Sequence, residues 1–145
     1  MVSFDTNVAK EFFDVRSPFH ATAIQFFDGI SNDPSVVIAE QMLVELYGLL
    51  RNPNVYLKPM SATAAVVVIE RFRANPSWRI VDVPDRRSFM DAVWKRVSQP
   101  QFAYRRIYDI RLAQTLIHHG VDTFYTRNME DFRDVGFARV IDPFA

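Results

Sequence analysis

The feature that most constrains the fold is the alternation of short apolar runs with longer segments of helical periodicity. The runs that we expect to form strands are 2–5, 36–38, 79–83, 122–126 and 138–142. The segments that we expect to form helices are 7–13, a helix that starts at Pro18 with Ser17 as its N-cap, 39–51, 62–74, 86–98 and 107–119. Strands that alternate with helices predict a mainly parallel sheet with helices on both faces. In such sheets the functional crevice lies beyond the carboxyl ends of the strands.

The composition excludes several kinds of chemistry. The chain has 145 residues, which is enough for one domain, expected over 1–145. It has no cysteine, so disulfides, thiolate metal sites and cysteine nucleophiles are excluded. We find no phosphate-binding glycine loop and no GxSxG nucleophile motif. With no recognisable signal peptide and no run long enough to span a membrane, we expect a cytoplasmic protein without a membrane partner.

The net charge argues against a simple electrostatic grip on a polyanion. The chain has 17 basic and 17 acidic residues, whereas proteins that bind nucleic acids are usually basic overall. A total of zero still allows a basic groove beside an acidic pocket, because the two cancel in the sum.

Three carboxylates occupy positions with apolar neighbours. Asp5 directly follows the first strand, Glu45 lies on the shoulder of an apolar helical stripe, and Asp109 lies on an apolar face near a helix start. Each has an ordinary alternative: an Asx-turn for Asp5, an exposed position for Glu45 and a helix-dipole partner for Asp109. Because several converging charges are costly to bury without a cation, the set as a whole favours a divalent metal site.

A further polar segment follows the strand at 122–126. Thr126, Arg127 and Asn128 come after this strand, and Asp131 lies three residues beyond Asn128. This spacing also suits a helix N-cap at Asn128 with Asp131 bonding back to it. Arg127 is the basic residue nearest the expected site.

Together these motifs resemble those of the PIN-domain nucleases, most closely the VapC-type ribonuclease toxins of prokaryotic toxin–antitoxin pairs. The resemblance rests on Asp5-Thr6-Asn7, Glu45 in "AEQMLVELYGLL", Asp109 in "YDIRLAQTLIHHG" and the segment "TRNMEDF" before the last strand. It spans nearly the whole chain, from Val2 to "RVIDPF". The resemblance implies a three-layer α/β/α sandwich with a mainly parallel sheet of roughly five strands.

The resemblance also implies a metal site for Mg²⁺ or Mn²⁺. Asp5, Glu45 and Asp109 would be ligands. The fourth position is open, because Asn128 stands where many relatives have aspartate and Asp131 matches a later acid; either would act directly or through water. The expected catalytic set is Asp5, Glu45, Asp109, Asn128 and Asp131, and the expected supporting or substrate-binding set is Thr6, Asn7, Thr126 and Arg127. Asn7 would either cap the next helix or join the hydrogen bonds of the site.

The function implied is metal-dependent hydrolysis of RNA, with a cognate antitoxin and a second copy of the chain as expected partners. A non-catalytic PIN-like binding module and a PIN nuclease of RNA processing are the alternatives. The presence of all three acids favours a nuclease over a scaffold. Arg105, Arg106 and Arg111 would either contact RNA phosphates or pair with nearby acids.

Overall fold

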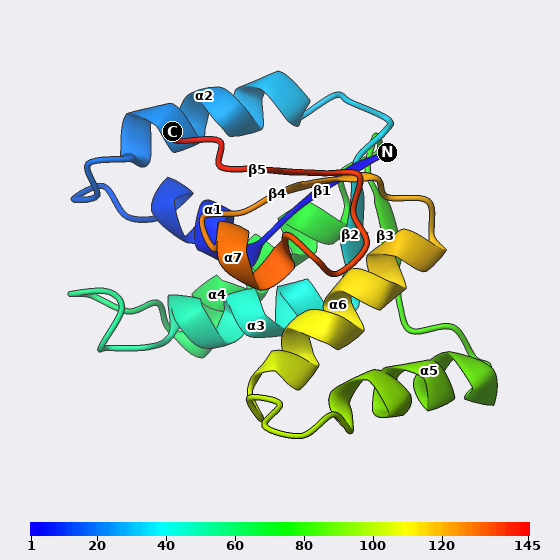
Figure 1. The fold of residues 1–145 in the computed structure, drawn as a ribbon. Coiled ribbons are helices and arrows are strands. Elements are labelled where there is room, and N and C mark those ends of the chain that lie inside the picture. Colours follow the sequence, from blue (N-terminus) through cyan, green and yellow to red (C-terminus); the bar gives the residue numbers. More distant parts are fainter.

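A computed structural model describes residues 1–145, and its centre is a parallel sheet (Figure 1). The strands are β1 (Val2–Phe4), β2 (Val37–Ala39), β3 (Arg79–Val81), β4 (Thr123–Tyr125) and β5 (Arg139–Ile141). β1, β4 and β5 pair in that order, β2 pairs with β3, and every pairing is parallel. A single parallel bridge between Val2 and Val36 joins the two groups, which gives the order β3-β2-β1-β4-β5. The predicted α/β class with a parallel, roughly five-stranded sheet is confirmed.

Seven helices surround these strands. They are α1 (Thr6–Phe12), α2 (His20–Ile30), α3 (Glu40–Leu50), α4 (Ala62–Arg73), α5 (Arg87–Val97), α6 (Arg106–His118) and α7 (Met129–Phe132). Figure 1 shows α2 on one side of β1, β4 and β5, with α3, α5 and α6 on the other side. A membrane-spanning helix would have to be longer and more apolar than any of these seven.

The predicted start of the second helix was wrong by two residues. The helix begins at His20, and its N-cap is Phe19, which makes no side-chain cap bond. The Ser17 hydroxyl, the predicted cap, instead donates to Glu11 and accepts the backbone N–H of Phe19 at 3.0 Å. The Ser17 hydroxyl therefore bonds to the buried Glu11 side chain and does not cap the helix.

The core holds the strands rigidly up to their carboxyl ends. Phe4 of β1 and Phe124 of β4 are almost completely buried, as are Ile38 of β2 and Leu46 of α3. Phe4 packs edge-on against Phe27 of α2, with ring centroids 5.0 Å apart. Burying these side chains stabilises the sheet, at about 1.5–3 kcal/mol for each fully buried large apolar side chain. The residues that follow β1 and β4 thus start from fixed positions.

Candidate active site

Asp5 and Thr126 meet at the carboxyl edge of the sheet because they follow neighbouring parallel strands. Asp5 comes directly after β1 and Thr126 directly after β4, and Phe4 lies opposite Tyr125 in the register. The Thr126 hydroxyl donates to Asp5 Oδ2 at 2.9 Å, and the Thr6 backbone N–H donates to Asp5 Oδ1 at 2.8 Å. Asp5 is therefore also the N-cap of α1. Its carboxylate is fixed from two elements while only 6% of the residue is exposed.

Asn7 joins this hydrogen-bond network, while Asp5 provides the cap of α1. The Asn7 amide donates to Thr126 Oγ1 at 3.3 Å, and Asn7 Oδ1 accepts the backbone N–H of Arg127 at 3.3 Å. The backbone N–H of Asn128 also donates to Thr126 Oγ1, at 2.9 Å. The hydroxyl that holds Asp5 is therefore itself held by the segment that follows β4.

Glu45, Asp109 and Asp131 complete a cluster of carboxylates around Asp5, which we call the acid cluster. Burial raises the pKa of Asp5, against the hydrogen bonds from Thr126 and Thr6, and the charge of Asp131 raises it further. Burial also raises the pKa of Glu45, with the Gln41 hydrogen bond opposing and the charges of Asp5 and Asp109 adding to the rise.

Asp109, from the first turn of α6, shows the same coupling. Burial, followed by the charges of Asp5 and Asp131, raises its pKa to about 6, and Arg106 opposes that rise. None of the four carboxylates of the acid cluster forms an ion pair within the protein. Negative charge is thus concentrated at one place, with Arg106 as a weak opposing charge and without an ion pair.

The donor set of the acid cluster fits a hard divalent cation by its chemistry. All its donors are carboxylate oxygens, and burial raises the pKa of Asp5, Glu45 and Asp109, so the protein compensates these ionised forms only in part. The side chains are not arranged so that three or more acidic or histidine groups could hold one ion directly. Mg²⁺ needs no such arrangement, because it commonly keeps several waters and binds one or two carboxylates.

Asn128 and Asp131 differ in how they relate to the acid cluster. Asn128 is the N-cap residue of α7, but its side chain makes no cap hydrogen bond, so the alternative of a reciprocal cap with Asp131 does not form. Only the backbone bond from Asp131 N to Asn128 O is present, at 3.1 Å. The Asp131 carboxylate acts on the pKa of both Asp5 and Asp109, whereas the Asn128 side chain hydrogen-bonds to none of the carboxylates.

The arginines near Asp109 are mostly bound within the protein. Arg106 donates to the Asp131 backbone oxygen at 3.1 Å, and Arg111 donates to Gln41 Oε1 at 2.7 Å. Arg105 is exposed and donates to its neighbour Tyr104. The Arg127 side chain is held by Glu11, at 2.9 Å, and not by the acid cluster.

Sequence reasoning missed two supporting residues. Gln41 donates to Glu45 Oε1 at 3.2 Å while its own oxygen is held by Arg111. Glu11 is buried and holds Arg127. Helical spacing was a usable signal for both, because Gln41 lies four residues before Glu45, and Glu11 four residues after Asn7, on the same helix faces.

Comparisons with known proteins agree with this architecture. No family model matches the chain. Ribonuclease VapC24 of Mycobacterium tuberculosis, in strains CDC 1551 / Oshkosh and ATCC 25618 / H37Rv, is 41% identical over 143 residues, which cover 99% of this chain and 97% of that relative. The crystal structure of M. tuberculosis VapC20, described as a sarcin-ricin loop cleaving toxin, superposes with a TM-score of 0.70 at 18% identity, covering 94% of this chain and 96% of that one. The structure of FitAB bound to an IR36 DNA fragment gives a TM-score of 0.63 at 20% identity, covering 100% and 96%.

The parallel sheet with acids beyond its carboxyl edge, shared in fold with VapC20, defines a PIN-like α/β protein. At 41% identity over nearly its full length, the chain belongs to the VapC family of PIN-domain ribonuclease toxins. The predicted family is confirmed.

Proposed function

We propose that this protein is a Mg²⁺- or Mn²⁺-dependent endoribonuclease that acts as the toxin of a type II toxin–antitoxin pair. The observation that carries the proposal is the acid cluster: one buried carboxylate that follows β1 and half-buried carboxylates on α3, α6 and α7 act on one another, and none forms an ion pair within the protein. The relation to Ribonuclease VapC24 supports RNA as the substrate.

The carboxylates of the acid cluster would bind the metal ion and accept a proton. Asp5, Glu45, Asp109 and Asp131 would hold the metal ion, directly or through water. A bound divalent ion supplies Lewis-acid stabilisation of the scissile phosphate and lowers the pKa of a bound water. A carboxylate oxygen of the acid cluster would take the proton of the attacking water, leaving a 5′-phosphate and a 3′-hydroxyl.

Thr126 and Asn7 would act by positioning. The Thr126 hydroxyl fixes one oxygen of Asp5, and Asn7 fixes that hydroxyl. Such partners orient a ligand carboxylate and are needed for its full effect. Asn128 would contribute through its backbone N–H, which donates to the same hydroxyl.

We also propose that a cognate antitoxin and a second copy of the chain are partners. Exposed valines on two neighbouring helices, Val44 on α3 and Val66 and Val67 on α4, offer apolar surface for a protein contact. Apolar groups gathered on a surface commonly mark interaction sites.

The test is an RNA cleavage assay with Mg²⁺ or Mn²⁺, with EDTA, and with metal restored after EDTA. Asp109→Asn should abolish most cleavage, whereas Asp91→Asn on α5, an exposed acid, should leave it unchanged. Cleavage that survives both EDTA and Asp109→Asn would exclude the metal mechanism. For the toxin role, expression of the wild type in a bacterium should arrest growth, and Asp109→Asn should relieve the arrest; harmless wild type would contradict that role.

A further inference from the structure

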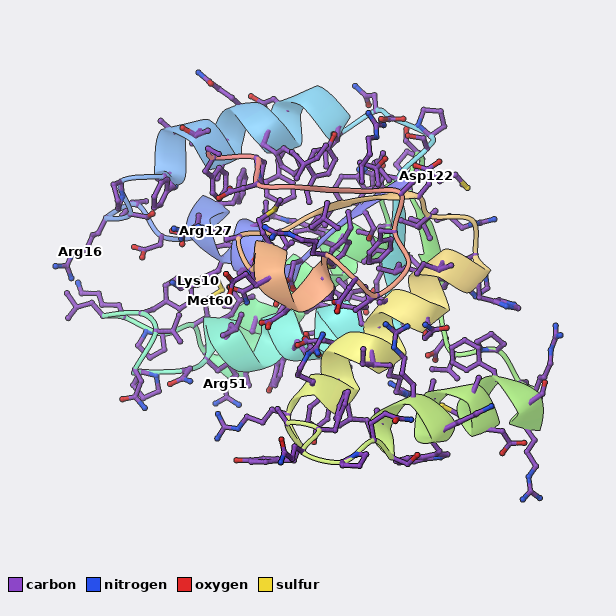
Figure 2. The ribbon with its side chains drawn as sticks, in the orientation of Figure 1. Lys10, Arg16, Arg51, Met60, Asp122 and Arg127 are labelled. Carbon is purple, nitrogen blue, oxygen red and sulfur yellow. The ribbon has the colours of Figure 1, made fainter.

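A polar pocket lies beside the acid cluster, and we call it the α1 pocket. Its volume is about 420 Å³. The lining side chains with charge or aromatic character are Lys10, Glu11, Asp14, Arg16, Phe19 and Arg127. Figure 2 shows Lys10 and Arg127 close to each other, with Arg16 at the edge of the same side of the molecule.

The α1 pocket and the acid cluster are built on the same two segments. Helix α1 starts from Asp5, in the acid cluster, and carries Lys10 and Glu11 near its other end. Arg127 directly follows Thr126, whose hydroxyl holds Asp5, and its backbone N–H donates to Asn7. A strand of nucleic acid lying across the acid cluster would therefore reach the α1 pocket with a neighbouring part of its backbone.

The charge in the α1 pocket is positive in balance. Lys10, Arg16 and Arg127 oppose Glu11 and Asp14 among its lining residues. Glu11 is only 4% exposed, and its oxygens are occupied by Arg127 at 2.9 Å, Lys10 at 3.7 Å and the Ser17 hydroxyl. Because Arg127 and Lys10 offset the charge of Glu11, the pocket keeps a small surplus of positive charge over its charged side chains. This is the basic site beside an acidic one that a net charge of zero allows.

The Arg127 side chain is fixed by contacts within the protein and still has donors available for a ligand. Its guanidinium carbon lies 4.1 Å from the ring centroid of Phe19, and only its Nη1 donates to a protein side chain. The other donors of this planar group are free, and 34% of the side chain is exposed. Arginine presents a rigid fork of donors that matches phosphate geometry. Arg16, at the pocket rim, makes no side-chain hydrogen bond or ion pair within the protein.

Two aromatic rings help to place Arg127. Phe19 stacks on Phe144 with ring centroids 5.5 Å apart, and the guanidinium carbon of Arg127 lies 4.1 Å from the Phe19 centroid and 5.9 Å from the Phe144 centroid. Because aromatic faces attract a cation, the two rings help to fix the guanidinium beside the α1 pocket.

We propose that the α1 pocket binds a phosphate of the RNA strand adjacent to the bond that the acid cluster cleaves, through Arg127, Lys10 and Arg16. This proposal rests on the ribonuclease function proposed above. Glu11 has the supporting role of holding Arg127 in place. The contact is independent of sequence and fixes where along the strand the scissile bond lies.

The test measures binding of a fluorescently labelled single-stranded RNA of mixed sequence to the full chain carrying Asp109→Asn, which suppresses cleavage. Each phosphate contact to a single strand contributes about 0.7 to the slope of log affinity against log salt concentration. Adding Arg16→Ala or Lys10→Ala should weaken binding about three- to tenfold and reduce that slope by about 0.7. Arg127→Lys, which keeps a cation beside Glu11 but loses the fork, should weaken binding with little change of slope.

The matched control is Arg87→Ala on α5, where the side chain is 94% exposed and remote from the α1 pocket. It should change neither the affinity nor the slope by as much as the pocket variants do. Unchanged affinity and slope in Arg16→Ala, Lys10→Ala and Arg127→Lys would overturn the proposal, as would the absence of any RNA binding.

Parallel cleavage assays separate this proposal from the one it rests on. If the wild type cleaves RNA while the pocket variants bind and cleave normally, the α1 pocket is not a phosphate site and the ribonuclease function stands. If the pocket variants lose affinity and slope as expected but the wild type cleaves no RNA with either metal, the pocket stands and the ribonuclease function fails.

Discussion

The two ends of helix α1 each bury a carboxylate, and they treat it in opposite ways. At the start of the helix, Asp5 is 6% exposed and receives only hydrogen bonds, from the Thr126 hydroxyl and from the backbone N–H and the hydroxyl of Thr6. Near the other end, Glu11 is 4% exposed and meets two cations, Arg127 and Lys10. Equal burial thus accompanies complete neutralisation in one case and none in the other.

This difference separates a structural carboxylate from one that is available to a ligand. A buried charge needs a partner, because its desolvation is otherwise uncompensated. Glu11 finds its partners within the chain, so it contributes to the fold and to the placement of Arg127. Asp5, Glu45, Asp109 and Asp131 form no ion pair within the chain, which supports the metal site proposed for them.

Among the variants that test this difference, we expect the largest effect from a substitution in the acid cluster. Asp109→Asn should lower RNA cleavage by at least about 100-fold, in the range in which proton-transfer groups contribute to catalysis. The same change should stabilise the metal-free protein, because it removes a charge whose pKa is raised by burial and by like charges. Thermal unfolding should show a melting temperature higher by a few degrees, since about 1 kcal/mol corresponds to about 2–4 °C at this chain length. A less stable, inactive variant would point to misfolding instead.

The second effect is on the hydroxyl that holds Asp5. Thr126→Val keeps the side-chain volume but removes the donor to Asp5 Oδ2. Loss of a group that orients a ligand carboxylate should lower cleavage about 10- to 100-fold, with a higher metal concentration needed for half-maximal rate. Thr115→Val is the matched control: this threonine is also buried, but its hydroxyl donates to the Arg111 backbone oxygen. Equal losses in both variants would show that the effect is on folding alone.

The third effect is on the paired carboxylate. Glu11→Gln leaves Arg127 without its counter-charge. Removing one partner of a fully buried pair costs about 3–5 kcal/mol, and the partial exposure of Arg127 reduces our expectation to about 1–3 kcal/mol. Urea unfolding should show this loss, whereas cleavage should fall by less than about tenfold because the acid cluster is intact. The opposite pattern, full stability with lost cleavage, would make Glu11 part of the catalytic site.

Much of this comparison was readable from the sequence. The β-branched and apolar runs gave the strands and their parallel arrangement, because a buried parallel strand needs both of its faces apolar. Asp5 and Thr126 followed from the rule that chemistry lies beyond the carboxyl ends of such strands. Glu45 and Asp109 stood out because they interrupt apolar helical faces.

The rest depended on tertiary contacts that no local pattern specifies. The local sequence predicted that the Ser17 hydroxyl caps a helix, but in the structure this hydroxyl donates a hydrogen bond to Glu11. Arg127 looked like a residue of the acid cluster from its place between Thr126 and Asn128, whereas its long side chain reaches Glu11, 116 residues away in sequence. The hydrogen-bond partner of such a side chain depends on which groups the fold brings near it, so sequence spacing alone does not predict it.

The smallest effect is a pH dependence of stability in the absence of metal. The folded-state pKa of Asp109, about 6, lies above its ordinary value of 3.8, so between these values the folded state binds more protons than the unfolded state. Stability therefore falls as the pH rises through this window, and lowering the pH from 7 to 5 in EDTA should raise the melting temperature by a few degrees. Asp33 and Asp122 have lowered pKa values and titrate below this window.

Two controls test this origin of the pH dependence. Asp109→Asn should flatten the pH dependence of the melting temperature. Mg²⁺ at pH 7 should raise the melting temperature of the wild type more than that of the variant. A wild-type melting temperature that does not rise on acidification would contradict the raised pKa of Asp109 and, with it, the mutual repulsion of the acid cluster.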